Sequence, residues 1–308
     1  MYLRHFALRE PPFSITPDSA FFFPHESAQA ALNTLLVALR SGEGFLKIVG
    51  EVGCGKTVLC RQLLKTLQGE CVTAYIPNPD MGPDDLLLAL LDEFGLDAAS
   101  ARRRDPAGHL RASRHQLMTL LANCLFQHAR AGRRVVVCID EAQAIPIKTV
   151  ESLRLLSNLE TEKQKLLQMV LLGQPELDAR LALPEIRQLL QRITFSEYLG
   201  PMTAGQVPLY LAHRLTTAAA SEVTDVQIFE SASAQSIARL SLGVPRVVNV
   251  LAHKCLMLAY GEGTHRVTPA HVQLAAVDTP GMILAAGGWR AMRARLTARW
   301  SARKGVWP

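Results

Sequence analysis

The sequence has no run of apolar residues long enough to cross a bilayer. A membrane-spanning helix needs about 20 consecutive apolar residues, and the longest late candidate, residues 282–289, is far shorter. The amino terminus also has no apolar stretch behind its first charged residues, which excludes a secretory signal of the usual kind. These absences predict a cytoplasmic protein.

Paired cysteines are missing as well. The six cysteines, at positions 54, 60, 71, 124, 138 and 255, form no C-x-x-C pair and no spacing typical of a metal site. They are expected to be reduced and mostly buried thiols, as in cytosolic proteins. The chain also has no low-complexity tract, and its 308 residues, 49% of them hydrophobic, suffice for two packed domains.

Acidic residues are absent from the last 30 positions, although six basic residues occur there. The rest of the chain therefore carries 27 of the 33 basic residues against all 27 acidic ones, and is neutral. A neutral body argues against a broad nucleic-acid-binding face, so nucleic acid is not an expected partner.

The basic tail has a helical pattern of its own. Its apolar side chains repeat at spacings of three and four residues: Trp289, Met292, Leu296 and Trp300. Such a basic amphipathic helix suits an anionic surface, and predicts peripheral contact with the inner membrane. A solvated tail and a docking segment for a partner protein are the alternatives.

Strands and helices alternate up to residue 200. Strands are predicted at 45–49, 72–76, 135–139, 166–172 and 193–198, with helical patterns between them. After Pro201 only helical patterns follow, at 204–219, 228–241, 245–261 and 269–277. We expect an α/β fold with a parallel five-stranded sheet flanked by helices. The predicted domains are a Pro- and Phe-rich strap (1–30), the α/β domain (31–200), a small all-helical lid (201–278) and the tail (279–308).

A phosphate-binding loop follows the first predicted strand. Residues 50–57 fit the pattern G-x-x-x-x-G-K-[ST] between a strand and a helix, which is the context this P-loop motif requires. Its glycines let backbone N–H groups surround phosphate oxygens, Lys56 would reach the β- and γ-phosphates of ATP, and Thr57 would hold Mg²⁺. The predicted nucleotide-binding residues here are Gly50, Glu51, Val52, Gly53, Cys54, Gly55, Lys56, Thr57 and Val58. Cys54 is expected to be exposed, so that bound ATP shields it from alkylation.

Two adjacent acids end the most hydrophobic predicted strand. Asp140 and Glu141 follow the run 135–139, at the strand end where ligands bind in open α/β sheets. Asp140 is predicted to contact Mg²⁺ through water, and Glu141 to polarise the attacking water. A solvated turn is the alternative for such a pair, but the P-loop upstream favours catalysis.

Three further polar residues are candidates for the same chemistry. Gln174 follows the next predicted strand and is placed to hydrogen-bond the γ-phosphate or the water. Arg192 precedes the last strand, and an arginine supplied there to a neighbour's γ-phosphate would stabilise transition-state charge. Arg246 follows Pro245 in the first turn of a predicted helix, where a cation opposes the helix dipole and a phosphate would favour it.

These elements, in this order and with an all-helical lid after the sheet, resemble the AAA+ ATPases. Within that family the chain resembles the ExeA/GspA ATPases of type II secretion, and most closely the MshM-type proteins of MSHA (type IV) pilus biogenesis. The segments that carry the likeness are 6–13, 42–45, 50–53, 75–79, 173–177, 191–193 and 243–246. The likeness covers residues 1–278.

The resemblance implies an ATPase cycle coupled to assembly of a pilus or secretion apparatus, nucleotide-dependent homo-oligomers, and partners among the assembly proteins. It places Gln174 at sensor 1, Arg192 at the arginine finger and Arg246 at sensor 2. Cys54 departs from the small Thr or Ser usual at that position. The membrane span and peptidoglycan-binding region of longer relatives are not recognised here, which weakens a cell-wall role.

Two other functions stay open at this point. AAA+ ATPases of DNA transactions, such as transposition helpers and helicase loaders, share this core, although no winged-helix or helix-turn-helix module is recognisable. A scaffold that binds ATP without hydrolysing it is the other alternative, and the presence of both Asp140 and Glu141 disfavours it.

Overall fold

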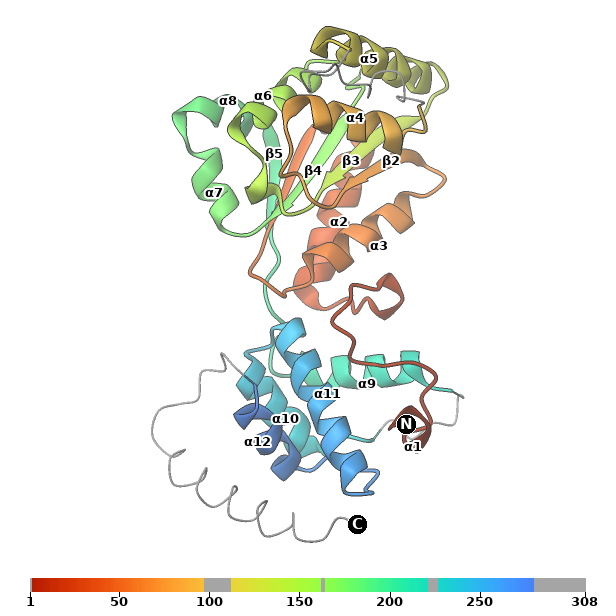
Figure 1. Ribbon diagram of the computed structural model, residues 1–308, viewed down its shortest axis with the longest axis vertical. Coiled ribbons are helices and arrows are strands. Elements are labelled where there is room, and N and C mark those ends of the chain that lie inside the picture. Colours follow the sequence, from red (N-terminus) through yellow and green to blue (C-terminus); the bar gives the residue numbers. More distant parts are fainter. Residues whose placement is uncertain (1, 97–111, 162–163, 221–226, 280–308) are drawn as a thin grey trace, which may run out of the picture. The chain divides into compact units, whose positions relative to one another are not determined.

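The structure is a computed structural model that describes residues 2–96, 112–161, 164–220 and 227–279. The chain forms two compact units, one of residues 26–200 and one that joins residues 1–25 to the chain from 201 onward (Figure 1). The amphipathic helix predicted in the tail and most of the predicted polar loop at 97–114 lie outside the described residues. Within the described residues no helix is long and apolar enough to span a membrane.

A parallel five-stranded sheet forms the centre of the first unit. Its strands run in the order β2-β3-β4-β1-β5, and every neighbouring pair is parallel. The strands are β1 (Phe45–Val49), β2 (Cys71–Ile76), β3 (Arg134–Ile139), β4 (Gln168–Gly173) and β5 (Ile193–Tyr198). The predicted α/β fold with a five-stranded parallel sheet is confirmed. Because β4 lies between β1 and β3, the loops that follow β1 and β3 meet across the end of β4.

Helices cover both faces of this sheet (Figure 1). Contacts place α2 (Glu26–Arg40) and α3 (Lys56–Leu67) against one face. The other face is covered by α4 (Pro83–Glu93), α5 (Arg114–Arg130) and α6 (Ile147–Leu156), followed by the short α7 (Glu176–Leu181) and α8 (Arg187–Leu190). Helices on both sides bury β1, β3 and β4, which explains why these strands are mostly apolar rather than alternating.

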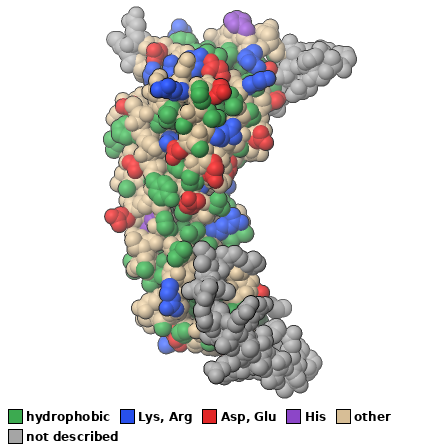
Figure 2. Space-filling view, turned by 90° about the vertical axis from the view of Figure 1, so that its left-hand side faces the viewer, with side chains coloured by type: hydrophobic (Ala, Val, Ile, Leu, Met, Phe, Trp, Pro, Cys, Tyr) green, Lys and Arg blue, Asp and Glu red, His purple; other side chains and the backbone are tan. Residues whose placement is uncertain are grey.

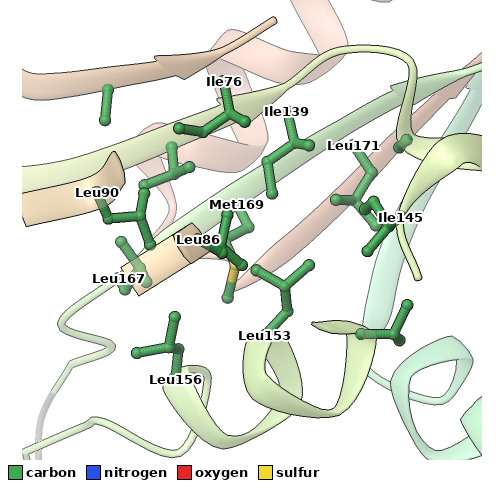
Figure 3. Close-up of a cluster of buried hydrophobic side chains, with 14 of the residues drawn as sticks. Ile76, Leu86, Leu90, Ile139, Ile145, Leu153, Leu156, Leu167, Met169 and Leu171 are labelled. Atoms are coloured by element: carbon green, nitrogen blue, oxygen red, sulfur yellow. The ribbon is translucent and has the colours of Figure 1, made fainter. Parts of the chain in front are cut away.

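The larger hydrophobic core lies under α4, α5 and α6. Figure 3 shows side chains of the strands, such as Ile139 and Met169, meeting Leu86 and Leu90 of α4 and Leu153 of α6. All five are fully or almost fully buried. This packing fixes the strand ends, and therefore the loops that carry the polar residues.

Replacing Leu153 tests this packing. Leu153 has 0% exposure, whereas Leu155 on the same helix is 41% exposed. We expect Leu153→Ala to lower the free energy of unfolding by about 2–5 kcal/mol, because a cavity remains. Leu155→Ala is the matched control and should cost about 0.5 kcal/mol or less. Urea denaturation followed by circular dichroism measures both, and equal losses would contradict the packing described.

Among its described residues, the second unit has four longer helices and the amino-terminal segment. The helices are α9 (Gln206–Ala218), α10 (Ser231–Ser241), α11 (Pro245–Gly261) and α12 (Pro269–Val277). The amino-terminal segment adds only the short α1 (Tyr2–His5) and a 3-10 turn at Ser19–Phe21. Its aromatic side chains, including Phe6 and Phe13, are buried in the core of this helical unit.

A buried arginine fastens the strap to the helices. Arg214 of α9 is 7% exposed and donates hydrogen bonds to the carbonyl of Pro12, to the hydroxyl of Tyr210 (3.1 Å) and to the carbonyl of Ser14 (3.4 Å). Its guanidinium also lies 4.5 Å from the ring centroid of Phe21. The strap carries irregular backbone, and these donors, together with Nδ2 of Asn249 on the Ser14 carbonyl (3.2 Å), satisfy its carbonyl groups.

The strap differs from the expected segment in two respects. Helix α2 begins at Glu26, so the strap ends at residue 25 instead of 30. The strap also packs with the helical unit, which begins at Pro201 and is distant from it in sequence. The apolar residues that suggested a strap do not reveal which distant segment they pack against.

Candidate nucleotide site

The loop between β1 and α3 has the backbone that a phosphate site requires. Gly53 and Gly55 have φ of 84° and 97°, in the left-handed region that favours glycine. Gly50 is needed for a different reason, because a Cβ there would lie 2.6 Å from the carbonyl oxygen of Leu199. Helix α3 begins directly after Gly55, which has no side chain to cap the helix. Its first N–H groups are therefore available to an anion.

Lys56 is held by the loop itself. Its side chain is 6% exposed, and Nζ donates to the carbonyl oxygens of Gly50 (2.7 Å) and Glu51 (3.1 Å). These contacts place the ammonium group inside the curve of the loop. Of the other predicted loop residues, Glu51 and Val52 are exposed and Val58 is half-buried in the first turn of α3.

Thr57 and Asp140 meet although 83 residues separate them in sequence. The hydroxyl of Thr57 donates to Oδ2 of Asp140 at 2.6 Å, and the hydroxyl of Tyr75 donates to the same oxygen at 3.3 Å. Burial of Tyr75, together with the nearby Asp140 charge, raises the pKa of the phenol, so it stays a donor at neutral pH. A hydroxyl beside a carboxylate is a set of hard oxygen ligands that suits Mg²⁺.

Glu141 and Gln174 are also brought together. Glu141 has a φ of 49°, an unusual value for a residue other than glycine and one that marks functional sites. Its Oε2 accepts hydrogen bonds from Nε2 of Gln174 at 3.0 Å and from the side chain of Gln143. The two predicted catalytic residues therefore share a hydrogen bond at the sheet edge that carries the P-loop.

Arg192 lies away from this site. It directly precedes β5, whose first residue Ile193 pairs with Phe45 at the start of β1, whereas the P-loop follows the end of β1 at Val49. Four residues of strand separate the two positions, about 13 Å along the strand direction. The guanidinium donates to Oγ of Ser157 at 2.9 Å.

Arg246 belongs to the helical unit. It is the second residue of α11, follows Pro245, and is exposed. Within the described residues its side chain makes no hydrogen bond or ion pair. The contact of Arg246 with nucleotide stays a prediction, because Arg246 and the P-loop belong to different units.

Cys54 is buried, so the expectation that it is exposed is wrong. Its relative exposure is 2%, and burial raises the pKa of its thiol. The side chain folds inward, although the neighbouring loop residues Glu51 and Val52 are exposed. A loop position in the sequence does not show which side chains the loop turns inward.

The burial of Cys54 predicts its chemical behaviour. Cys71, at the start of β2, is half-buried, and we expect iodoacetamide at neutral pH to modify it before Cys54, whose thiolate is disfavoured by burial. Mass spectrometry of timed digests measures the two rates. Denatured protein is the control, in which both thiols should react alike; faster labelling of Cys54 in the folded chain would contradict the structure.

Sequence reasoning assigned no role to Tyr75, Gln143 or Arg180, all of which contact this site. Arg180 of α7 donates to the carbonyl oxygens of Gln143 and of Ile145 (2.6 Å) and so fixes the turn after Glu141. The only sequence signal for Gln143 was its place two residues after Glu141. Arg180 lies on a helix of six residues, which has too few positions to show a helical pattern.

Comparisons with known proteins agree with this geometry. A family model described as an AAA domain matches residues 39–181. General secretion pathway protein A of Aeromonas hydrophila is 40% identical over 282 residues, which are 92% of this chain. The chain belongs to the AAA+ family, in the group of general secretion pathway protein A. It spans 49% of the length of that relative.

Solved structures place the AAA+ fold over most of the chain. The ADP form of the Aeropyrum pernix ORC2 protein has a TM-score of 0.64 at 16% identity, covering 88% of this chain and 73% of that one. Cdc6p from Pyrobaculum aerophilum has a TM-score of 0.67 at 15% identity, covering 91% and 73%. Identities this low show the shared fold alone.

Proposed function

We propose that this AAA+ protein hydrolyses ATP with Mg²⁺ and couples the cycle to assembly of a type II secretion or type IV (MSHA-like) pilus apparatus. The observation that carries the hydrolysis is the meeting of Thr57 with Asp140 and of Glu141 with Gln174 at one edge of the sheet. The relative's name, general secretion pathway protein A, supports the secretion setting.

Each residue has a distinct task in this proposal. Lys56 and the first N–H groups of α3 bind the phosphates, and Thr57 and Asp140 hold the Mg²⁺. When bound, the metal neutralises charge on the β- and γ-phosphate oxygens. Glu141 accepts a proton from the attacking water.

Gln174 orients the attacking water or the γ-phosphate. Its amide already contacts the carboxylate of Glu141, so the residue that senses phosphate and the residue that acts on water are linked directly.

The distribution of charge favours this function over a DNA transaction. Figure 2 shows Lys and Arg side chains interspersed with Asp and Glu over the face in view. Some exposed basic residues are paired with acids, as in Arg40 with Glu70 and Arg114 with Asp84. The likeness to ORC and Cdc6 proteins concerns fold alone, and a DNA-binding surface would concentrate positive charge. Salt-dependent binding to duplex DNA would favour the alternative.

Replacing Glu141 tests hydrolysis. We expect Glu141→Gln to lower kcat about a hundredfold to ten-thousandfold, because a carboxamide cannot accept the proton, while ATP binding persists. Glu151→Gln, which removes the same charge from an exposed ion pair with Arg154, is the matched control and should leave kcat unchanged. Phosphate release measures turnover. Full turnover in Glu141→Gln would refute the assignment, and no turnover in the unsubstituted chain would favour a non-hydrolysing scaffold.

The position of Arg192 at the opposite strand end favours a role in a neighbouring subunit. We propose that it serves as an arginine finger for the site of a second copy in a homo-oligomer. Arg192→Ala should lower turnover about a thousandfold, and Arg187→Ala, an exposed arginine five residues earlier, is the control. Mixing Arg192→Ala with Glu141→Gln should restore turnover, since the second variant supplies Arg192 to the intact site of the first. A mixture as inactive as its components would contradict a role in trans.

A further inference from the structure

Gln143 bridges the ends of two neighbouring strands. It lies in the 3-10 turn Ala142–Ala144 after β3, and its Nε2 donates to Oε2 of Glu141. Its Oε1 accepts a hydrogen bond from the backbone N–H of Gln174, at the end of β4, at 3.0 Å. One carboxamide therefore joins the residue proposed to act on water to the residue proposed to sense phosphate.

The chemistry of its partners fixes the orientation of this amide. A backbone N–H can only donate, so the atom facing Gln174 must be the amide oxygen of Gln143. An ionised carboxylate can only accept, so the atom facing Glu141 must be the amide nitrogen. A flipped amide would lose both bonds and set two oxygens against each other, so a single orientation satisfies the site.

The surroundings hold the side chain in place. Arg180 donates to the carbonyl of Gln143 and fixes its backbone. A Cβ at Gly173 would lie 3.1 Å from Oε1 of Gln143 and 2.8 Å from Cδ2 of Leu177, so glycine at the end of β4 gives the amide room to approach. Helix α7 thus holds the backbone of Gln143, and the end of β4 holds its side chain.

We propose that Gln143 is a positioning residue that fixes the carboxylate of Glu141 for the attack of water on ATP. This inference rests on the proposed hydrolysis. Both amides, of Gln143 and of Gln174, donate to Oε2 of Glu141. Within the described residues Oε1 accepts no hydrogen bond, so it is the oxygen that takes the proton of the water. Gln143 also keeps Glu141 bound when the Gln174 side chain turns to phosphate.

Substitutions that keep the size of the side chain test the role. Gln143→Met removes both hydrogen bonds, and we expect kcat to fall about ten- to a hundredfold, the range for losing one hydrogen bond to a charged group. The Kd for ADPNP with Mg²⁺ should stay within about twofold, because the phosphate-binding loop is untouched. Gln143→Glu should be worse than Gln143→Met, since two carboxylates would then face each other. Gln127→Met on the exposed side of α5 is the matched control.

The outcomes separate positioning from a general structural role. In the Glu141→Gln background, Gln143→Met should cause no further loss of turnover, because it acts through Glu141. Any one of three results would overturn this inference but leave the proposed function standing. They are an unchanged kcat in Gln143→Met, a rise of its Kd for ADPNP as large as its fall in kcat, and an additional loss of turnover in the double variant. Absence of hydrolysis that depends on Glu141 would instead overturn the proposed function, and this inference with it.

Discussion

The hydrogen bond between Thr57 and Asp140 is the contact on which the arrangement of the site depends. Thr57 follows β1 and Asp140 follows β3, but these strands are not neighbours, because β4 lies between them. The bond therefore joins the ends of two strands across the end of a third. Gln174, at the end of β4, lies between the P-loop and the two acids and contacts Glu141.

Helix α7 links β1 to the turn that follows Glu141. Lys47, in the middle of β1, is 8% exposed and pairs with Asp178 of α7. A buried ammonium group without that partner would be costly. Arg180, two residues later, holds the turn that contains Gln143. This short helix thus ties β1 and the turn after Glu141 to one another, so that a shift of α7 would move both.

Local patterns predicted much of this molecule. Strand-like segments alternating with helical ones predicted five parallel strands, and proline at the first helical turn marked the starts of α11 and α12 at Pro245 and Pro269. Contacts between segments that are distant in sequence could not be predicted from these patterns. Gln143 meets Gln174 because of the order of the strands in the sheet. Cys54 is buried because of the conformation of its loop. Neither the strand order nor the loop conformation follows from the residues next to these positions. The prolines and phenylalanines of the strap correctly predicted irregular backbone. The contact of Pro12 with Arg214 could not be predicted in this way, because the two residues are 202 positions apart.

The discontinuous helical unit has a consequence for how the chain is made. Residues 1–25 leave the ribosome before the helices that bury Phe6 and Phe13, which are encoded after residue 200. The α/β unit is a continuous stretch and can complete its core while the chain is still growing. The amino-terminal aromatic residues must meanwhile wait in water, or with a chaperone, until α9 and the later helices emerge. Helices that are translated later therefore complete the burial of aromatic residues that were translated earlier.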